Sequence, residues 1–424
     1  MRVCFVAENA WSAIAEDGRF PFGGMETQAW AFAQCLQALR VCDVSFAVST
    51  PFRFRSQQRS GIEVLNRSAW IEHVRRDVAR RCVISRNWPP VKIRKWHRSL
   101  VWKLPLLAAT RPFRSSAAEQ RSVADFYSHL PADVVIAYGV SSLTTAIVEA
   151  ARSAGKRTIV SCASNDDLRT EYRTNPDYVN AYGDRADVLY RGLTQADRIL
   201  VQTSHQQQLA RANLDLDACV VPNPIDERWI EWASQSETLL QGLFGKHSEL
   251  QQPFVLWTGR TDRFHKRPAI ALQIARQLPQ VQFVMVLDVT DPAIHEELKA
   301  RKPENVLMLS PLCYPMFVAL MSRAVAFLST GSKHYEGFPN VFLQAGLLGV
   351  PVVSAECDFG ILSETGIGRA FNDSVSDLVQ HLDKFMKRPV EPNHRTNASD
   401  TAQRVRERYG AHTIAARLWQ ALQE

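Results

Sequence analysis

Several features that would restrict the class of this protein are missing from its 424 residues. No stretch approaches the roughly 18 consecutive apolar residues of a membrane span. The apolar run at residues 1–7 is too short for a signal peptide. The eight cysteines are scattered, without a Cys-x-x-Cys pair or the spacing of metal ligands. We therefore expect a reduced, cytoplasmic protein, either soluble or peripheral on the inner face of the membrane.

The composition is that of a folded protein with an uneven charge. Hydrophobic residues make up 46% of the chain, enough for sizeable cores, and the length suggests two or three domains. Residues 53–114 contain 16 lysines and arginines but only three acidic residues, an excess larger than the net charge of +7 for the whole chain. The remainder is therefore acidic on balance, and a basic segment is set into it.

Short apolar runs alternate with helical patterns along both halves of the chain. This alternation predicts βαβ units and a parallel, doubly wound sheet in each half. We expect strands at 3–7, 44–48, 132–139, 158–162, 197–204, 254–257, 282–287, 306–309 and 324–328, and helices at 26–39, 142–154, 269–278, 293–301 and 402–423.

The most informative stretch follows the predicted strand at 324–328. A loop leads to the sequence Glu336-Gly-Phe-Pro-Asn340, a helical pattern runs from Val341 to Leu348, and the next strand begins near Val350. Pro339 suits the first helical turn, where its missing N–H costs nothing. A carboxylate thus lies at the carboxyl end of a strand, where open α/β sheets bind ligands. The free N–H groups around Asn340 would face an anion there.

This stretch resembles the donor site of retaining GT-B glycosyltransferases of family four (glycosyl transferases group 1). The resemblance rests on Glu336-Gly337-Phe338-Pro339-Asn340-Val341, on Ala345 and on Gly349-Val-Pro-Val-Val353. It implies that Glu336 meets the donor sugar. A second glutamate, eight positions on, holds the ribose hydroxyls in the family, and this chain has Gln344 there. A neutral amide predicts weaker donor binding by about tenfold, without loss of activity.

Gly259 and Arg260, together with Lys266, match the arginine and lysine with which the family holds the donor phosphates. Two fixed cations would stabilise the negative charge that builds on a leaving diphosphate. By resemblance, no metal or other cofactor is needed, because these cations replace one. We expect the neighbouring Arg263 and Arg267 to be solvated.

Three features of the first half complete the predicted site. Gly23 and Gly24 precede a helix, where they form either a tight turn or, as in the family, a loop that faces the donor diphosphate. Tyr138 stands where family members often carry a histidine for acceptor orientation. Asp166 and Asp167 either meet acceptor hydroxyls or cap the following helix.

The basic segment at about 51–126 matches nothing specific in the family. It interleaves Trp70, Trp88, Trp96 and Trp102 with its cations. Such a pattern suits a solvated face with packed tryptophans, an anionic membrane surface or, with less weight, nucleic acid. The resemblance favours the membrane, since many family members glycosylate lipid-linked acceptors.

We therefore expect an α/β protein of the GT-B class, with two Rossmann-like domains facing a cleft. The predicted boundaries are an acceptor-side domain at 1–225 that contains the basic segment, a linker at 226–252, a donor domain at 253–400 and a crossover helix at 401–424. The expected activity is hexosyl transfer, with retention, from a nucleotide-diphosphate sugar to a glycan or lipid-linked acceptor, in surface polysaccharide or glycoconjugate biosynthesis.

Three alternatives stay open from the sequence. A degenerate GT-B protein that binds without turnover is favoured by Gln344 and Tyr138 and opposed by Glu336, Arg260 and Lys266. A sugar epimerase or phosphorylase would share the fold. A nucleic-acid-binding protein would use the basic segment, with affinity that falls steeply with salt.

Overall fold

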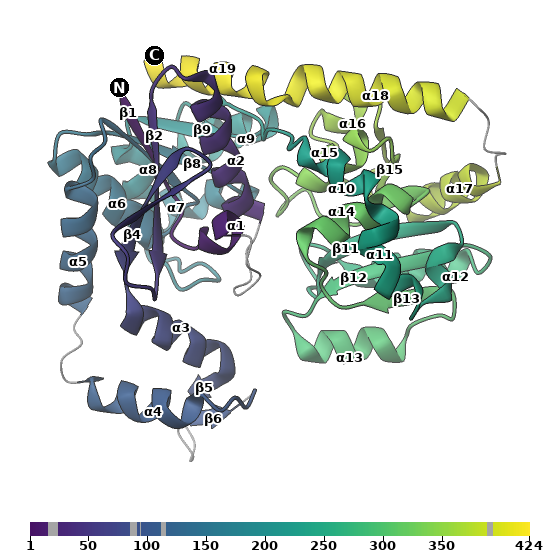
Figure 1. The fold of residues 1–424 in the computed structure, drawn as a ribbon, viewed down its shortest axis with the longest axis horizontal. Coiled ribbons are helices and arrows are strands. Elements are labelled where there is room, and N and C mark those ends of the chain that lie inside the picture. Colours follow the sequence, from purple (N-terminus) through teal and green to yellow (C-terminus); the bar gives the residue numbers. More distant parts are fainter. Residues whose placement is uncertain (16–23, 85–90, 94, 112–115, 388–392) are drawn as a thin grey trace. The chain divides into compact units, whose positions relative to one another are not determined.

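The computed structural model describes residues 1–15, 24–84, 91–93, 95–111, 116–387 and 393–424 (Figure 1). Two compact units can be distinguished. The first contains residues 1–161 and 174–199, and the second contains residues 162–173 and 200–424. The domain boundaries expected from the sequence remain a prediction.

An eight-stranded sheet organises the first half of the chain. Its strand order is β10-β9-β8-β7-β1-β2-β4-β3, and the pairings from β4 through β1 to β8 are parallel. At one edge, β3 runs antiparallel to β4. The strands are β1 (Arg2–Val6), β2 (Asp43–Thr50), β3 (Ser56–Arg59), β4 (Ile62–Ser68), β7 (Val134–Tyr138), β8 (Arg157–Ser161), β9 (Arg198–Val201) and β10 (Cys219–Val220).

Helices cover both faces of this sheet, and its central strands are therefore buried. Every residue of β7 is buried, as are four of the five in β1, which is typical of a parallel sheet. On one face, Cys4 and Val135 pack in a cluster with Tyr127 and Ile147 from two covering helices. The helices of this unit are α1 (Trp11–Ala15), α2 (Gly24–Leu39), α3 (Trp70–Arg81), α4 (Leu100–Ala109), α5 (Ser116–Ser128), α6 (Ser142–Ser153) and α8 (Ala186–Gln195).

The basic segment is partly sheet and partly helical. Residues 56–68 of this segment supply β3 and β4. The two strands that extend the sheet beyond β2 therefore lie within the segment that the charge pattern set apart. Beyond them, α3 packs against α4, and a small antiparallel pair is formed by β5 (Cys82–Ile84) and β6 (Val91–Ile93) (Figure 1). Trp88 lies outside the described residues.

A buried ion-pair network lies where β1 and β4 end. The Arg67 guanidinium donates to both oxygens of Glu8, at 2.7 and 3.0 Å, and to both oxygens of Glu72, at 2.7 Å each. The Tyr127 hydroxyl donates to Glu8 at 2.8 Å. Burial by itself raises the pKa of Glu72, but the Arg67 guanidinium outweighs burial and holds this pKa below its ordinary value. The network thus ties the loop after β1 to the end of β4 and to α3.

The second unit contains a six-stranded, all-parallel sheet in the order β13-β12-β11-β14-β15-β16. The strands are β11 (Phe254–Arg260), β12 (Gln282–Asp288), β13 (Val306–Leu309), β14 (Ala326–Ser329), β15 (Val352–Ser354) and β16 (Gly368–Ala370). Counted from β11, this is the Rossmann order 3-2-1-4-5-6, with its topological switch between β11 and β14.

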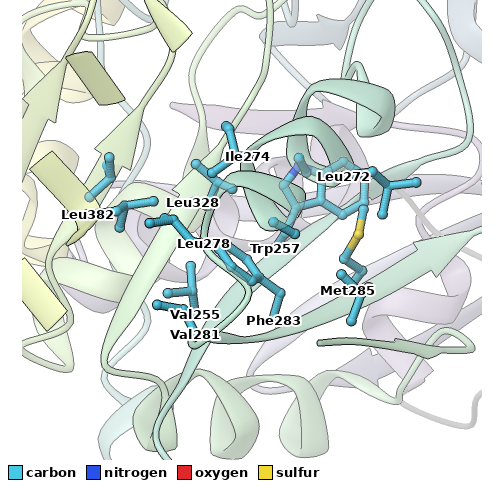
Figure 2. Close-up of a cluster of buried hydrophobic side chains, with 14 of the residues drawn as sticks. Val255, Trp257, Leu272, Ile274, Leu278, Val281, Phe283, Met285, Leu328 and Leu382 are labelled. Atoms are coloured by element: carbon cyan, nitrogen blue, oxygen red, sulfur yellow. The ribbon is translucent and has the colours of Figure 1, made fainter. Parts of the chain in front are cut away.

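An apolar cluster fills the space between one face of this sheet and the helices that cover it (Figure 2). Val255, Trp257, Phe283 and Met285 come from neighbouring strands, and Leu272 lies on the covering helix. The other elements of this unit are η2 (Asn165–Leu168), α7 (Glu171–Thr174), α9 (Ser204–Leu209), η3 (Ala210–Leu214), α10 (Arg228–Ser234), α11 (Ser236–Phe244), η4 (Ser248–Gln251), α12 (Pro268–Gln277), α13 (Pro292–Ala300), α14 (Tyr314–Arg323), α15 (Asn340–Leu347), α16 (Ile361–Thr365), α17 (Val375–Met386), α18 (Asn393–Tyr409) and α19 (Ala411–Gln423).

Two local expectations need correction. The single helix expected at 402–423 is two helices, α18 and α19, because the chain turns at Gly410. A Cβ there would collide with the carbonyl oxygen of Arg406, so the turn needs glycine. Pro339 is the N-cap of α15 and lies one position before the first turn in which the sequence placed it. Within the described ranges, no helix is long and apolar enough to cross a bilayer.

We expect Arg67→Ala to lower the free energy of unfolding by about 3–5 kcal/mol, because it leaves the buried carboxylate of Glu8 and the partly buried carboxylate of Glu72 without their cation. Urea denaturation followed by circular dichroism measures this loss. Arg191→Ala is the matched control, since Arg191 pairs with Glu149 at the surface and should change stability little. Equal effects of the two substitutions would contradict the role given to the network.

Candidate functional site

The candidate site lies at the topological switch of the six-stranded sheet. The loop that follows β11 spans residues 261–267, and the loop that follows β14 spans residues 330–339. Because β11 and β14 are parallel neighbours, their carboxyl ends and both loops meet at the same edge. The residues that the sequence singled out from these two loops are therefore brought together by the strand order.

The loop after β11 is shaped by Asp262. Its Oδ1 accepts hydrogen bonds from the backbone N–H groups of Phe264, His265 and Lys266, at 3.2, 2.6 and 2.9 Å. Three amides turned toward one carboxylate oxygen make a tight turn without regular secondary structure. This turn places the side chains of His265 and Lys266 toward the loop after β14.

Direct hydrogen bonds fasten the two loops to each other. The Trp257 indole donates to Thr330 Oγ1 at 2.8 Å, and this hydroxyl donates to the Lys266 carbonyl at 2.6 Å. The Ser332 amide donates to the His265 carbonyl at 2.9 Å. Since Trp257 and Thr330 are buried, the positions of the loops relative to each other are set from within the core.

Glu336 is a buried carboxylate that accepts hydrogen bonds from two residues of the other loop. It is 8% exposed, and its Oε2 accepts from Lys266 Nζ at 2.6 Å and from His265 Nε2 at 3.0 Å. Burial by itself raises the pKa of Glu336, but the Lys266 charge and the His265 hydrogen bond outweigh it and bring this pKa well below its ordinary value. Glu336 is therefore ionised at neutral pH.

His265 links Glu336 to Arg260. Arg260 Nη2 lies 2.7 Å from His265 Nδ1, and a guanidinium only donates hydrogen bonds. His265 Nδ1 must therefore accept, which leaves the ring proton on Nε2, where it is donated to Glu336. The four side chains form one chain of contacts, from Arg260 through His265 and Glu336 to Lys266. The sequence analysis missed His265, although its place between Arg260 and Lys266 in one loop was a usable signal.

Arg267 corrects the expectation of a solvated side chain. Its guanidinium donates to the carbonyls of Thr330 and Gly331, at 2.8 and 3.1 Å, and pairs with Glu356 at 3.4 Å. The backbone of Arg267 is left-handed, with φ of 48°, which turns the chain into α12. Arg267 thus positions the loop after β14. Arg263 is 63% exposed for its side chain and pairs with Glu297, in keeping with a solvated residue.

Two predicted glycines allow close approaches. A Cβ at Gly259 would lie 2.8 Å from Lys266 Cβ and 2.9 Å from the Trp257 ring, so only glycine lets Lys266 pass over the strand end. A Cβ at Gly337 would lie 2.6 Å from the Ala163 carbonyl oxygen. A side chain at either position would therefore collide with a neighbouring group, so both positions need glycine.

The first turn of α15 presents backbone donors next to Glu336. Pro339 caps the helix, and its carbonyl accepts from the Phe342 amide at 2.8 Å. The amides of Asn340 and Val341 lie in the first turn, where a helix has no acceptors of its own for its N–H groups. The Asn340 side chain accepts from Asn223 at 2.6 Å. Phe338, also predicted for the site, is buried and packs edge-on against Tyr409.

Gln344 lies on the inner face of α15 and is buried. Its Nε2 donates to the Tyr314 hydroxyl at 2.6 Å, while its Oε1 has no hydrogen-bond partner among the described residues. Turning the amide by 180° would exchange the two atoms and leave the nitrogen unpartnered. In either orientation, one polar atom of Gln344 remains available to a ligand or a water molecule.

The remaining predicted residues have structural contacts. Gly23 lies outside the described residues, and Gly24 is the first residue of α2. Tyr138 is buried and packs against Phe5 and Phe32, and burial raises the pKa of its hydroxyl.

Of the two alternatives that the sequence left open for Asp166 and Asp167, capping applies to Asp167. Its Oδ2 accepts from the Ala163 and Ser164 amides, at 2.6 and 3.0 Å, in a capping box. Asp166 pairs with Arg169 at 2.7 Å. Across the described ranges, no group of three or more His, Cys, Asp or Glu side chains is arranged to hold a metal ion.

The sequence matches no protein-family model and no curated protein. Solved structures, in contrast, match over the whole chain. The E. coli trehalose-6-phosphate structure bound with UDP-2-fluoro glucose has a TM-score of 0.65 at 12% identity and covers 100% of this chain and 99% of its own. Anabaena Alr3699/HepE in complex with UDP has a TM-score of 0.58 at 16% identity and covers 100% of both chains.

A third similar structure is UDP-GlcNAc 2-epimerase from Neisseria meningitidis bound to UDP-GlcNAc, with a TM-score of 0.53 at 13% identity and 100% coverage of both chains. At these identities the likeness concerns the fold. The chain is an α/β protein with the GT-B fold, built from two Rossmann-like domains.

A double-mutant cycle measures the coupling between Lys266 and Glu336. We expect Lys266→Met to lower the free energy of unfolding by about 1–3 kcal/mol, because Glu336 loses its cation while buried. Glu336→Gln in the same background should recover much of this loss, since a neutral amide needs no cation. Additive losses in the double variant would show that the pair is not coupled.

The lowered pKa of Glu336 gives the stability a defined pH dependence. A carboxylate whose pKa is lowered by folding stabilises the folded state above its unfolded pKa, near 4.5, and this contribution is lost as the pH falls below that value. We compare the melting temperatures of the wild type and Glu336→Gln at each pH. Below about pH 4.5, we expect the wild type to lose melting temperature relative to Glu336→Gln, so that the difference between them departs progressively from its value at pH 7. A difference that stays constant from pH 7 to pH 3 would contradict the lowered pKa.

Proposed function

We propose that this protein is a retaining glycosyltransferase of family four, which transfers a sugar from a nucleotide-diphosphate donor to a hydroxyl of a glycan or lipid-linked acceptor. One observation carries the proposal. The three residues with which the family would act, Glu336, Lys266 and Arg260, form one connected group at the topological switch of a Rossmann-ordered sheet. The three similar structures described above are each bound to UDP or to a UDP sugar.

The reaction breaks the bond between the anomeric carbon and the diphosphate oxygen, and the acceptor oxygen bonds to the same carbon. The electron pair of the broken bond stays on the diphosphate. The acceptor proton passes to the leaving phosphate oxygen on the same face, so the configuration is retained. Charge therefore moves from the sugar to the phosphate in the transition state, and groups that stabilise this separation accelerate the step.

Arg260 and Lys266 are suited to the developing phosphate charge. Lys266 uses one of its three donors for Glu336, which leaves two for phosphate oxygens. The Arg260 side chain is half-exposed, with one terminal nitrogen 2.7 Å from His265 and its Nε 4.0 Å from Asp262. Its second terminal nitrogen is left for phosphate oxygens. Backbone amides at the start of α15 add a positive field on the opposite loop. In this proposal, these groups do the work that a divalent cation does in other transferases.

Glu336 would hydrogen-bond the hydroxyls of the donor sugar and favour the positive charge at the anomeric carbon. Its Oε2 is occupied by Lys266 and His265, while Oε1 has no partner among the described residues. His265 acts as a positioning residue, because both of its ring nitrogens are used to hold Arg260 and Glu336.

A second candidate is a nucleotide-sugar 2-epimerase, favoured by the likeness to the enzyme bound to UDP-GlcNAc. Epimerisation would exchange the proton at carbon 2 of the sugar with solvent deuterium, whereas glycosyl transfer leaves that proton in place. A third candidate, a binding protein without turnover, would be stabilised by a nucleotide sugar and release no nucleotide. Proton NMR in deuterated water therefore separates all three.

The first experiment is a panel of UDP, GDP and ADP sugars, assayed by thermal stabilisation and by slow donor hydrolysis. We expect one donor to stabilise the wild type and to be hydrolysed. Arg260→Ala and Glu336→Gln should each lower the hydrolysis rate by about a hundredfold or more, since each removes a group that acts on charge in the transition state. Arg263→Ala is the matched control, because this exposed arginine lies in the loop that follows Arg260 and pairs with Glu297 at the surface.

Three outcomes would count against the proposal. If no nucleotide sugar at millimolar concentration shifts the melting temperature, the candidate site does not bind donors. If Arg263→Ala lowers hydrolysis as much as Arg260→Ala, the loop is merely disturbed. If the anomeric proton of the product shows inversion, the transferase proposal stands and the retaining assignment falls.

Gln344→Glu tests the proposed ribose contact. We expect the variant to bind the nucleotide about tenfold more tightly, because a carboxylate makes charge-assisted hydrogen bonds to ribose hydroxyls. The Tyr314 hydroxyl can rotate and donate to the new carboxylate, so the fold should tolerate it. Calorimetric titration with UDP and with uracil plus phosphate separates a ribose effect from a general charge effect. Unchanged or weaker UDP binding in a folded variant would refute the ribose assignment.

A further inference from the structure

A hollow of about 300 Å³ lies in the first unit, and its lining contains none of the candidate donor residues. Its walls come from the residues that follow β1 and β2 and from helices α3 and α4 of the basic segment. These are again the carboxyl ends of neighbouring parallel strands, where open α/β sheets receive ligands. The volume is at the lower end of the range for small-molecule sites and suits one ring with its substituents.

Three indoles line this hollow, namely Trp11, Trp70 and Trp102. Trp70 and Trp102 are nearly parallel, with ring centroids 6.4 Å apart, and are 44% and 48% exposed. Large aromatic rings that remain this exposed at the rim of a hollow provide flat apolar faces without filling the space. Such faces bind the flat side of a ring and give up little conformational entropy.

The charged residues of the lining are positive on balance. They are Arg76, Arg80 and Lys103 against Asp77 alone. Asp77 accepts from Lys103 at 2.7 Å and from Arg81 at 3.1 Å, so its negative charge is already neutralised. Arg80 is exposed and has no hydrogen-bond or ion-pair partner in the part of the chain that the structure describes. Arg76 lies 3.7 Å from Glu72 and donates to Asn9 at 2.6 Å. Of the lining cations, Arg80 is therefore the one that an anionic ligand would find without displacing an acidic neighbour in the described part of the chain.

Neutral polar groups complete the lining. Ser12 is 1% exposed, and its hydroxyl has no hydrogen-bond partner among the described residues. The Ser49 hydroxyl lies 3.3 Å from His73 Nε2. Burial, followed by the Arg76 charge, lowers the pKa of His73 to about 4, so this ring is neutral at pH 7. A buried hydroxyl without a partner is costly, and a ligand with hydroxyl groups would satisfy it.

We propose that this hollow binds a phosphorylated sugar, with its ring against Trp70 and Trp102, its hydroxyls toward Ser12 and Ser49, and its phosphate toward Arg80. Each feature of the lining matches one part of that molecule. A nucleic acid would need a continuous basic track, and a flat membrane surface would not reach a buried hydroxyl inside a hollow.

The binding itself is independent of the donor site. Only the assignment of the bound molecule as the acceptor rests on the proposed function. The sugar phosphate has two sources, free in solution or as the headgroup of a lipid. Both present a ring with several hydroxyl groups next to a phosphate, so the experiment includes both.

The test is isothermal titration calorimetry of the full chain without any nucleotide sugar. The probes are glucose 1-phosphate, methyl glucoside and inorganic phosphate. Glucose 1-phosphate should bind, and each of the other two should bind at least about tenfold more weakly, since each lacks one half of the recognised chemistry. Trp102→Ala and Arg80→Ala should each weaken glucose 1-phosphate binding at least about fivefold.

Matched controls come from the same segment. Trp96→Ala and Arg75→Ala change an exposed tryptophan and an exposed arginine that do not line the hollow, and they should leave binding unchanged. In the lipid arm, flotation uses phosphatidylcholine vesicles with one part in ten of phosphatidylinositol, against one part in ten of phosphatidylserine. Preference for phosphatidylinositol that is lost in Arg80→Ala would identify the lipid source of the same chemistry.

Other results would overturn the proposal. These are the absence of binding in both arms, inorganic phosphate that binds as tightly as glucose 1-phosphate, equal binding to both kinds of vesicle, or a single-stranded oligonucleotide that displaces glucose 1-phosphate. Losses in Trp96→Ala or Arg75→Ala equal to those in the lining variants would do the same. If glucose 1-phosphate binds as expected while no donor is hydrolysed, the hollow stands and the proposed function fails.

Discussion

The candidate site depends on one buried carboxylate that must remain charged. Glu336 is removed from water by the packing of the loop after β14, and an ionised group in that position is costly without partners. Lys266 and His265 supply them, and both come from the loop after β11. The geometry of the site therefore follows from an electrostatic requirement. Arg267 and Thr330 keep the two loops in the positions at which the requirement is met.

A similar requirement shapes the first unit. Glu8 follows β1, is buried, and is satisfied by Arg67 from the end of β4 and by the Tyr127 hydroxyl. In both units, a carboxylate close to the end of a strand is held by groups from elements far away in sequence. The parallel sheet brings these strand ends together, since consecutive parallel strands all end at the same edge. The strand order of the sheet brings the polar groups together, and their ion pairs and hydrogen bonds keep the buried carboxylates charged.

Much of the fold was predictable, because alternating apolar runs and helical patterns depend on local sequence. The apolar runs at 254–257 and 282–287 are β11 and β12, and the pattern at 269–278 is α12, each within a few residues. For the site, the motif placed Glu336 and Lys266 in two loops that do meet, and Arg260 at the strand end that leads into one of them. His265 and Arg267 escaped prediction because their roles arise from contacts across the sheet edge, to which no periodicity refers. The break at Gly410 escaped for a similar reason, since the helical pattern continues on both sides of it.

The basic segment shows what composition alone cannot decide. Its charge and tryptophans were compatible with a membrane surface, nucleic acid or a solvated face, because composition carries no positions. The structure assigns its members to different tasks. Arg67 is buried as an internal counter-ion, Lys103 neutralises Asp77, and Trp70 and Trp102 border a hollow. The cations of the segment thus fall into two groups, those paired with acidic residues inside the fold and those left for a ligand. Only the latter, of which Arg80 is the clearest, bear on what the first unit recognises.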